Sequence, residues 1–251
     1  MSNDQANALI DALARVRTLM PSATALDGQD FSRFSAEWHA MTEAMKDAVF
    51  QANPKNAQPD RRKFEYASGA QSIQFMADLL PFLHDRMVRH YDRFDELGLL
   101  DVGAGSAAGT QLLAQLHSDD LIWSRLRVEA VDHVPWRQRW VAMHYPQVNY
   151  QVLASAALPS RHWDFVVCSH VIEHLADPTQ MIDDVLRACR GFAFLYAPYN
   201  EVELSPGHLS VITEETFLRH GACEIHLMDS MGFHGPGRRC ILAVFDRREA
   251  V

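Results

Sequence analysis

The sequence predicts an α/β protein with a doubly wound, mostly parallel seven-stranded sheet, an antiparallel hairpin at one sheet edge, and an N-terminal helical cap. The first observation is a change of pattern along the chain. Up to about residue 95 the apolar residues have helical spacing, and from Leu97 onward short apolar runs alternate with segments long enough for helices. The second is an ordinary globular composition, with 48% apolar and 22% charged residues among 251. Such a chain can bury a sizeable core.

The N-terminal part contains the elements of the predicted cap. Apolar residues recur every three or four positions in residues 4–20 and again in 31–49, which predicts two amphipathic helices. The polar segment 53–62 contains two prolines and predicts a loop or hinge. A third helix is expected at about 68–91, with a kink at Pro81.

Apolar runs in the rest of the chain predict the strands of the sheet. They lie at 97–102, 126–131, 148–153, 165–169, 192–196, 223–227 and 241–245. The last two are joined by a segment rich in Gly and Pro that is too short for a crossover helix, so they should pair antiparallel. We therefore divide the chain into a helical cap on the substrate side, residues 1–95, and an α/β domain, residues 96–251.

Charge and cysteine content narrow the classes of partner. The formal net charge of −9 disfavours DNA and anionic membrane surfaces. No apolar run approaches the roughly 20 residues of a membrane span, and the N-terminus lacks the basic region of a signal peptide. The four cysteines have no CxxC spacing and are typical of reduced thiols. We expect a cytoplasmic protein with a small-molecule substrate, and a homodimer is the assembly left open.

A glycine-rich loop follows the first predicted strand in the segment LLDVGAGSAAGT, residues 99–110. Glycines at a strand's carboxyl end let the backbone approach a ligand before a helix begins. Asp132 ends the next strand, where a carboxylate can accept hydrogen bonds from both ribose hydroxyls or, alternatively, cap a helix. Gly103, Gly105 and Ala108 also satisfy the dinucleotide fingerprint. An NAD(P)-dependent oxidoreductase and a tight turn without ligand therefore remain alternatives.

A third motif distinguishes between the ligand classes. The segment WDFVVCSHVIEHLADP, residues 163–178, resembles the fourth strand and its exit in class I S-adenosylmethionine-dependent methyltransferases. FAFLYAPYNE at 192–201 resembles the fifth strand of that family, and GHLSVITEETF at 207–217 a later segment. The resemblance covers about residues 95–247. It implies a Rossmann-like fold and S-adenosylmethionine as the cofactor, with S-adenosylhomocysteine as the product.

The same resemblance implies a cofactor site at the carboxyl ends of the strands. Asp101 and the glycine loop would line the methionine portion, Asp132 would bind the ribose, and His133 would flank the adenine. The family often has an acidic residue after the third strand, where this chain has Ala154. We therefore assign the adenine contact to Ser155 or to backbone groups. The complete predicted set is Asp101, Gly103, Ala104, Gly105, Asp132, His133, Ser155, Ser169 and His170.

Catalysis is expected to depend on alignment of donor and acceptor and, for some acceptors, on removal of a proton. The candidate bases are His170, ranked first, then His208 and His174, because imidazole titrates near neutral pH. Alternatively, Glu173 and His174 only orient the neighbouring helix and loop. The loop 198–204, which leaves the carboxyl end of the fifth strand, is the expected substrate contact.

We predict methyl transfer to an oxygen or nitrogen of a small molecule, without metal ligands. One alternative follows from a resemblance to small-RNA 2′-O-methyltransferases, which implies a divalent metal held by His170, Glu173, His174 and His208. That enzyme would act on RNA or a sugar, although the net negative charge argues against RNA. The remaining alternative is a non-catalytic relative that binds the cofactor.

Overall fold

The computed structural model describes residues 59–117, 125–205, 207–233 and 238–248. The compact unit that carries the sheet comprises residues 67–133 and 137–251, apart from those gaps. The helices predicted at 4–20 and 31–49 lie outside the described residues.

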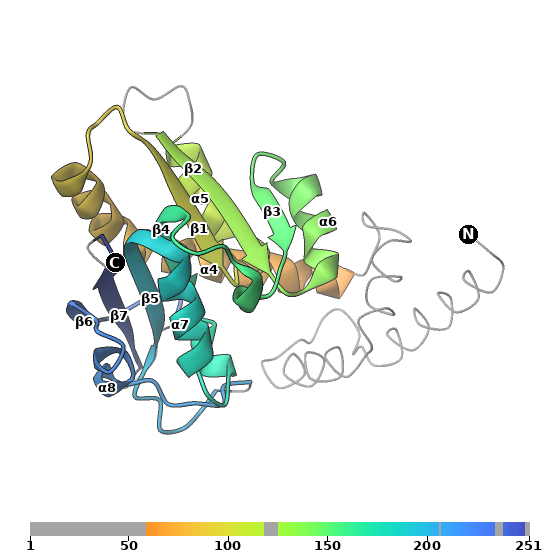
Figure 1. Ribbon diagram of the computed structural model, residues 1–251. Helices are drawn as coiled ribbons and strands as arrows, with labels where there is room; N and C mark the ends of the chain where they lie inside the picture. The colour runs from red at the N-terminus through yellow and green to blue at the C-terminus, as the bar shows by residue number, and fades with distance from the viewer. Residues whose placement is uncertain (1–58, 118–124, 206, 234–237, 249–251) are drawn as a thin grey trace. The chain divides into compact units, whose positions relative to one another are not determined.

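The described elements alternate between strands and helices, as the change of sequence pattern predicts (Figure 1). In chain order they are α4 (Pro59–His90), β1 (Glu96–Val102), α5 (Ala108–Leu116), β2 (Arg125–Asp132), α6 (Pro135–His144), β3 (Asn149–Val152), η1 (Ser155–Ala157), β4 (Trp163–Ser169), η2 (Ile172–His174), α7 (Thr179–Ala188), β5 (Cys189–Tyr199), α8 (Glu214–Leu218), β6 (Glu224–Met228) and β7 (Arg239–Asp246). The elements η1 and η2 are single turns of 3-10 helix.

The sheet has seven strands in the order β3-β2-β1-β4-β5-β7-β6. The pairs among β3, β2, β1, β4 and β5 are parallel, whereas β7 pairs antiparallel with both β5 and β6. The predicted fold class and the antiparallel edge are therefore confirmed. Val102, near the end of β1, lies opposite Val131 of β2 and Cys168 of β4, which brings the exits of three strands to one edge. In a doubly wound sheet, ligands bind at that edge.

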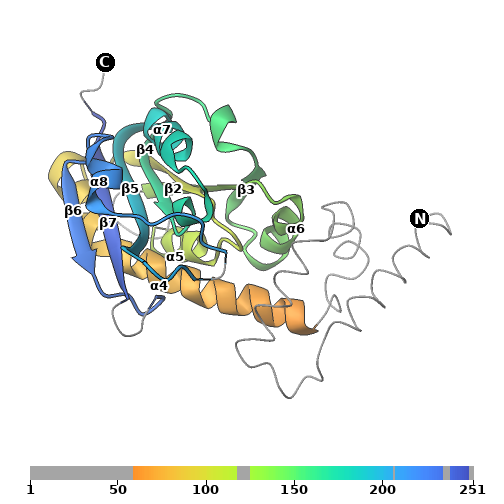
Figure 2. The same ribbon diagram turned by 90° about the horizontal axis from the view of Figure 1, so that it is seen from below.

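Alternation along the strands divides the core between the two faces of the sheet. Leu99 and Phe165 belong to a cluster that includes Leu79 of α4 and Leu113 of α5. Their strand neighbours, such as Leu100 and Val166, point to the other face and join a cluster with Ile182 of α7 and Phe217 of α8. Figure 2 shows α4 and α5 below the sheet and α7 and α8 above it.

The third predicted helix is present but begins earlier than expected. Residues 59–62, predicted as the end of a loop, form the first turn of α4, where a proline at the first position needs no hydrogen-bonded N–H. Leu79, Leu83 and Met87 are buried in the same cluster as β1. From residue 67 onward this helix is therefore part of the compact unit of the sheet, although the sequence analysis assigned it to the cap. The rest of the predicted hinge, 53–58, lies outside the described residues.

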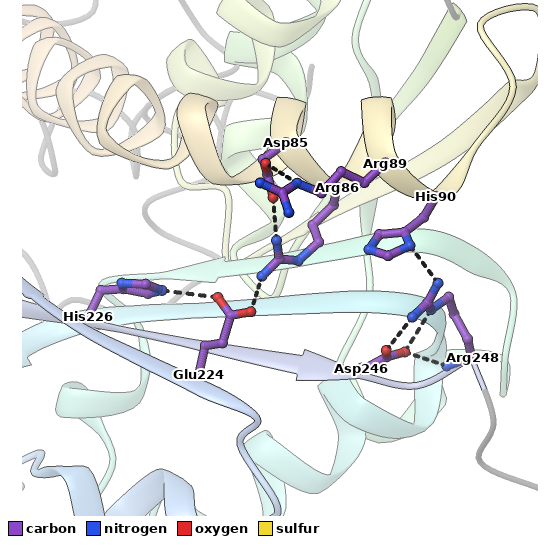
Figure 3. Close-up of polar contacts among 8 residues, drawn as sticks. All are labelled: Asp85, Arg86, Arg89, His90, Glu224, His226, Asp246 and Arg248. Carbon is purple, nitrogen blue, oxygen red and sulfur yellow. Dashed lines mark hydrogen bonds and ion pairs between the residues drawn. The ribbon is translucent and has the colours of Figure 1, made fainter.

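The C-terminal half of α4 is tied to the edge hairpin by a set of charged side chains that we call the α4 charge network (Figure 3). Arg86 donates to Asp85 and to Glu224 of β6, both at 2.5 Å. Near the end of β7, Arg248 donates to Asp246 and to Nδ1 of His90. The members of the α4 charge network are Asp85, Arg86, Arg89, His90, Glu224, His226, Asp246 and Arg248.

Two further properties bear on the sequence predictions. No described helix combines the length and apolarity needed to cross a lipid bilayer. All four cysteines are free thiols.

Candidate active site

The glycine loop is fixed to the neighbouring strand by its own backbone. The N–H groups of Gly103 and Ala104 both donate to the carbonyl oxygen of Val131 in β2, at 2.8 and 3.1 Å. Gly103 has a φ of +74°, and a Cβ at this position would lie 2.3 Å from Cγ2 of Val171. Only glycine satisfies both the backbone angle and the space. The exit of β4 is therefore in direct contact with the loop after β1.

Asp132 lies beside this loop, as predicted. Its carboxylate is 4% exposed, and Oδ2 accepts from the N–H of Gly105 and from Nη1 of Arg137, each at 3.0 Å. Nδ1 of His133 lies 3.4 Å from Oδ1. The hydroxyl of Tyr150 in β3 also donates to the carbonyl of Gly105, at 3.1 Å. The sequence analysis missed Arg137, whose only signal is a basic residue at the start of the helix after Asp132.

The loop surface at Gly105 suits the close approach of a ligand. This glycine has a φ of +57°, and among the described residues a Cβ here would have only the Arg137 guanidinium within 4 Å, at 3.9 Å. A long flexible side chain rather than packed core thus lies over the loop. The residues present therefore fit a cofactor that rests on this backbone.

Asp101 gives the same region a second carboxyl group. It is 4% exposed, and burial raises its pKa to about 6. The negative charge of Asp132 adds to this increase, whereas a hydrogen bond from Thr110 at 2.6 Å favours the ionised form and reduces it. Two neighbouring carboxyl groups suit a ligand that carries positive charge, such as the sulfonium and amino groups of S-adenosylmethionine. The two carboxyl groups are therefore chemically compatible with that cofactor.

Ser155, predicted to contact the adenine, lies in η1 after β3. Its hydroxyl donates to Oδ2 of Asp184 in α7 at 2.8 Å. The hydroxyl hydrogen is thus engaged, which leaves the oxygen lone pairs and nearby backbone groups for the amino group of adenine. The adenine assignment remains a prediction.

His170 occupies the exit of β4 in a left-handed backbone conformation, with a φ of +53°. Its ring stacks on Phe75 of α4 with centroids 3.4 Å apart. Nδ1 lies 3.3 Å from Oγ of Ser169, and Nε2 lies 3.7 Å from Sγ of Cys240. Burial lowers the pKa of His170 well below its usual range, so the ring is neutral at physiological pH. Both ring nitrogens are thus adjacent to groups of the protein itself.

A second group of side chains lies where η2 meets the loop after β5, and we call it the β4–β5 polar cluster: Glu173, His174, Glu201 and His208. The side chain of Glu173 is nearly enclosed, since the residue is 1% exposed. Neither of its carboxylate oxygens has a hydrogen-bond partner among the described residues. Burial, together with the charge of Glu201, raises the pKa of Glu173 to about 8, and the weak approach of its own backbone N–H, which falls short of a hydrogen bond, opposes the shift.

The two histidines of this cluster have ring centroids 4.9 Å apart. Nδ1 of His174 contacts the carbonyl oxygen of Gly207 at 2.9 Å, and burial lowers the pKa of His174. Nδ1 of His208 contacts Oε2 of Glu201 at 2.5 Å. Burial opposes the ionisation of Glu201, but hydrogen bonds from Ser205 and His208 lower its pKa below the usual range.

The structure brings the predicted catalytic histidines to one region but gives them different surroundings. His170 and His208 both lie near the ring of Phe233, with centroid distances of 6.2 and 6.4 Å, and His174 adjoins His208. Within the part of the chain that the structure describes, His208 is the one of the three that is paired with a carboxylate. The sequence analysis did not single out Glu201, although it lies in the loop 198–204 that was expected to contact the substrate. This geometry favours His208 over His170.

Comparisons with known proteins identify the family of this chain. A family model described as a methyltransferase domain matches residues 38–217. A curated protein from Mycolicibacterium smegmatis, a probable S-adenosylmethionine-dependent methyltransferase, is 30% identical over 139 residues. That match covers 54% of this chain and 51% of the relative, so the chain aligns with about half of that protein.

Three solved structures share the fold, each with a TM-score of 0.50. Magnesium protoporphyrin IX methyltransferase from Synechocystis PCC 6803 with bound S-adenosylhomocysteine is 16% identical, covering 70% of this chain and 83% of its own. A putative sarcosine dimethylglycine methyltransferase from Galdieria sulphuraria is 10% identical, covering 71% and 86%. The cyclase SpnF is 13% identical, covering 66% and 78%. At these identities the likeness concerns the fold alone, and the fold hosts more than one reaction.

Proposed function

The chain belongs to the methyltransferase-domain family, with S-adenosylmethionine as its cofactor, and we propose that it transfers the methyl group to an oxygen or nitrogen atom of a small molecule. The family assignment decides against the nicotinamide-dependent oxidoreductase that the glycine pattern left open. The choice of acceptor is the new part of the proposal, and it depends on the β4–β5 polar cluster.

The cofactor side of the reaction is assigned to the carboxyl ends of β1 and β2. When bound, S-adenosylmethionine supplies an electrophilic methyl group on a positively charged sulfur. Asp132 accepts hydrogen bonds from the ribose hydroxyls, and the loop at Gly103–Gly105 supports the methionine portion. Arg137, which shares Oδ2 of Asp132 with Gly105, fixes the orientation of that carboxylate. These residues align the methyl group, and alignment is the main requirement of an in-line displacement.

The acceptor side is assigned to His174 and His208. The observation that carries this proposal is the contact of His208 Nδ1 with Glu201 at 2.5 Å, which orients the imidazole and directs Nε2 away from the carboxylate. Polar groups fixed in this way recognise an O–H or N–H group and assist its loss of a proton.

A small molecule rather than a nucleic acid fits the charge of the site. The net charge is −9, and the polar cluster itself contains the carboxylate of Glu201, whose pKa lies below its usual range. Negative charge around the acceptor site repels phosphates, whereas proteins that bind RNA concentrate Lys and Arg.

The test is to locate the transferred methyl group. The purified chain is incubated with S-adenosylmethionine labelled in its methyl group and, separately, with a small-molecule extract, total RNA and a protein extract. We expect label in the small-molecule fraction, with an NMR chemical shift typical of a methyl group on oxygen or nitrogen. The Asp132→Asn variant is the control, since it should bind cofactor weakly and transfer little label.

Each alternative has its own outcome. Label in RNA or protein, or on carbon, would contradict the proposed acceptor. Tight binding of S-adenosylhomocysteine without transfer to any fraction would instead indicate a non-catalytic relative. A thermal-shift measurement detects that binding, because a ligand selective for the folded state raises its stability.

A further inference from the structure

We infer that Glu173, His174 and His208 form a binding site for one divalent transition-metal ion. One ligand atom from each of the three side chains lies within 4.8 Å of the other two. Glu173 and His174 belong to η2, and His208 belongs to the loop after β5. The two segments are joined by the N–H of Leu209, which donates to the carbonyl of Glu173 at 2.7 Å. Small side-chain movements would bring the three atoms to the roughly 2.0–2.2 Å of metal–ligand bonds.

Hydrogen bonds fix both imidazoles in the form that binds metals. A carbonyl oxygen can only accept, so the contact of His174 Nδ1 with Gly207 places the ring hydrogen on Nδ1. The carboxylate of Glu201 requires the same of His208. In the neutral form of each ring, Nε2 is then the atom with a lone pair. Metal-binding histidines characteristically donate their other N–H to a carbonyl or a carboxylate, as these two do.

The carboxyl group of Glu173 provides independent support. It is 1% exposed, and both oxygens are without a hydrogen-bond partner among the described residues. Buried polar groups are normally satisfied, and a buried one that is not points to a missing ligand or a functional role. The charged group that acts on Glu173 is another carboxylate, Glu201, so a cation would reduce the repulsion between them.

The ligand chemistry selects the class of ion. Two imidazoles and one carboxylate are the ligands of many catalytic zinc sites and also suit other first-row transition metals, whereas Mg²⁺ prefers oxygen ligands. We expect Zn²⁺ to bind more tightly than Mg²⁺. His170 is not part of the set, because its ring stacks on Phe75 and its Nε2 lies beside Cys240. The site therefore differs from the four-residue set implied by the resemblance to small-RNA methyltransferases.

A role for the ion in the reaction rests on the proposed function. When the ion is bound, Nε2 of His174 and of His208 hold the ion, and the two histidines assist the acceptor through it rather than by direct contact. Three protein ligands leave at least one coordination position for an acceptor hydroxyl, and a bound divalent ion makes that hydroxyl more acidic. The hydroxyl proton leaves to solvent. A lone pair on the oxygen then forms the new carbon–oxygen bond as the carbon–sulfur bond breaks, and the electron pair of that bond stays on sulfur.

The site is tested by metal binding, without any assay of methyl transfer. Tag-free full-length protein is stripped with a chelator and titrated with Zn²⁺, Mn²⁺ and Mg²⁺ in competition with a chelating dye. We expect one equivalent of Zn²⁺, bound at least tenfold more tightly than Mg²⁺. Glu173→Gln and His208→Ala should each weaken zinc binding at least tenfold, and Glu201→Gln should weaken it about 10- to 100-fold. His226→Ala, which alters a Glu-paired histidine outside the cluster, should have no effect.

Two measurements make the outcome independent of variant folding and of the proposed function. The Co²⁺ form of the wild-type protein should show the visible absorption bands of an ion bound by imidazoles. The site is overturned if the wild type binds no zinc, or if it binds zinc exactly as the Glu173→Gln and His208→Ala variants do. Stoichiometric binding without methyl transfer to any acceptor would retain the site and overturn the proposed function. Binding together with chelator-resistant transfer would retain the site and overturn its catalytic role.

Discussion

Two polar groups of this molecule both combine carboxyl groups with histidines but differ in how their charges are matched. In the α4 charge network each carboxylate has an arginine partner: Arg86 and Arg89 for Asp85, Arg86 for Glu224, and Arg248 for Asp246 (Figure 3). The β4–β5 polar cluster instead combines two glutamates with two histidines, and Glu173 lacks a hydrogen-bond partner among the described residues.

This difference separates structural from functional polarity. A matched set of charges lowers the free energy of the folded state and has little capacity left for a ligand. A buried carboxyl group without a partner costs free energy in the folded state, and such groups are concentrated at sites where binding or chemistry satisfies them. The α4 charge network accordingly connects α4 to the edge hairpin, and we expect the polar cluster at the carboxyl ends of β4 and β5 to bind a ligand.

The strongest test of the comparison uses two histidines, one from each group, that both contact a glutamate. His208 contacts Glu201 at 2.5 Å, and His226 contacts Glu224 at 3.2 Å. We expect His208→Ala to reduce kcat by about 10²–10⁴, the usual range when a group that assists proton transfer is removed. His226→Ala should leave kcat unchanged. The measurement is turnover at saturating cofactor, and equal effects of the two substitutions would remove the distinction between the groups.

The next effect concerns cofactor affinity. Asp132→Asn removes the negative charge that the ribose hydroxyls and Arg137 are expected to share. Hydrogen bonds to charged groups are worth about 1.5–3 kcal/mol, so affinity for S-adenosylhomocysteine should fall by about 10- to 150-fold. Calorimetric titration with S-adenosylhomocysteine measures this affinity. The matched control is Asp246→Asn, which removes an arginine-paired carboxylate of the α4 charge network and should leave the affinity unchanged. Unchanged affinity in a folded Asp132→Asn protein would mean that the ribose is bound elsewhere.

The third prediction concerns the α4 charge network, where we expect a substitution to lower stability rather than activity or cofactor affinity. Arg86 is 8% exposed and bridges Asp85 and Glu224. Arg86→Ala should lower the free energy of unfolding by about 2 kcal/mol, less than for a fully buried pair because both carboxylates are partly exposed to solvent. Cofactor affinity should remain unchanged.

Arg89→Ala is the control for Arg86→Ala, because Arg89 pairs with the same Asp85 from an exposed position. Its effect should be below about 0.5 kcal/mol. Both variants are measured by urea unfolding. A loss of cofactor affinity in Arg86→Ala without a loss of stability would contradict a purely structural network.

The sequence predicts the sheet well because each strand is an apolar run between polar segments, and such periodicity is local. All seven runs became strands, including the hairpin whose Gly/Pro-rich connection excludes a helix. The position of Asp132 beside the glycine loop also follows from local rules, since parallel strands end at one edge.

The polar cluster could not be predicted in the same way. Glu173 and His208 are close because the loop after β5 turns back onto η2, a contact between segments distant in the sequence. Likewise, nothing local shows that His170 stacks on Phe75, a residue assigned by its helical spacing to a separate cap. Tertiary contacts thus decide which histidine remains accessible to an acceptor.

The smallest predicted effect is a pH dependence that contrasts two aspartates. In Asp246, hydrogen bonds from Arg248 lower the pKa, so its stabilising contribution is present at neutral pH and is lost as pH falls through that lowered value. The pKa of Asp101 is shifted in the opposite direction, so its contribution to stability changes with pH in the opposite sense. Burial raises its pKa to about 6, so the folded protein holds this proton more tightly than the unfolded chain, and stability from this group declines as pH rises from about 4 to 6.

Binding of a positively charged cofactor should recover the negative charge of Asp101. We therefore expect a proton to be released when S-adenosylmethionine binds near pH 6, and affinity to fall about tenfold at pH 5, where only about a tenth of Asp101 is ionised. Calorimetry at pH 6 in two buffers of different ionisation enthalpy measures the released proton. The same titration at pH 8 should show none, because Asp101 is then already ionised. Asp101→Asn should bind without release at either pH, whereas Asp246→Asn should behave as the wild type. Equal proton release from the wild type and from Asp101→Asn would assign the proton to another group and remove Asp101 from the methionine end of the site.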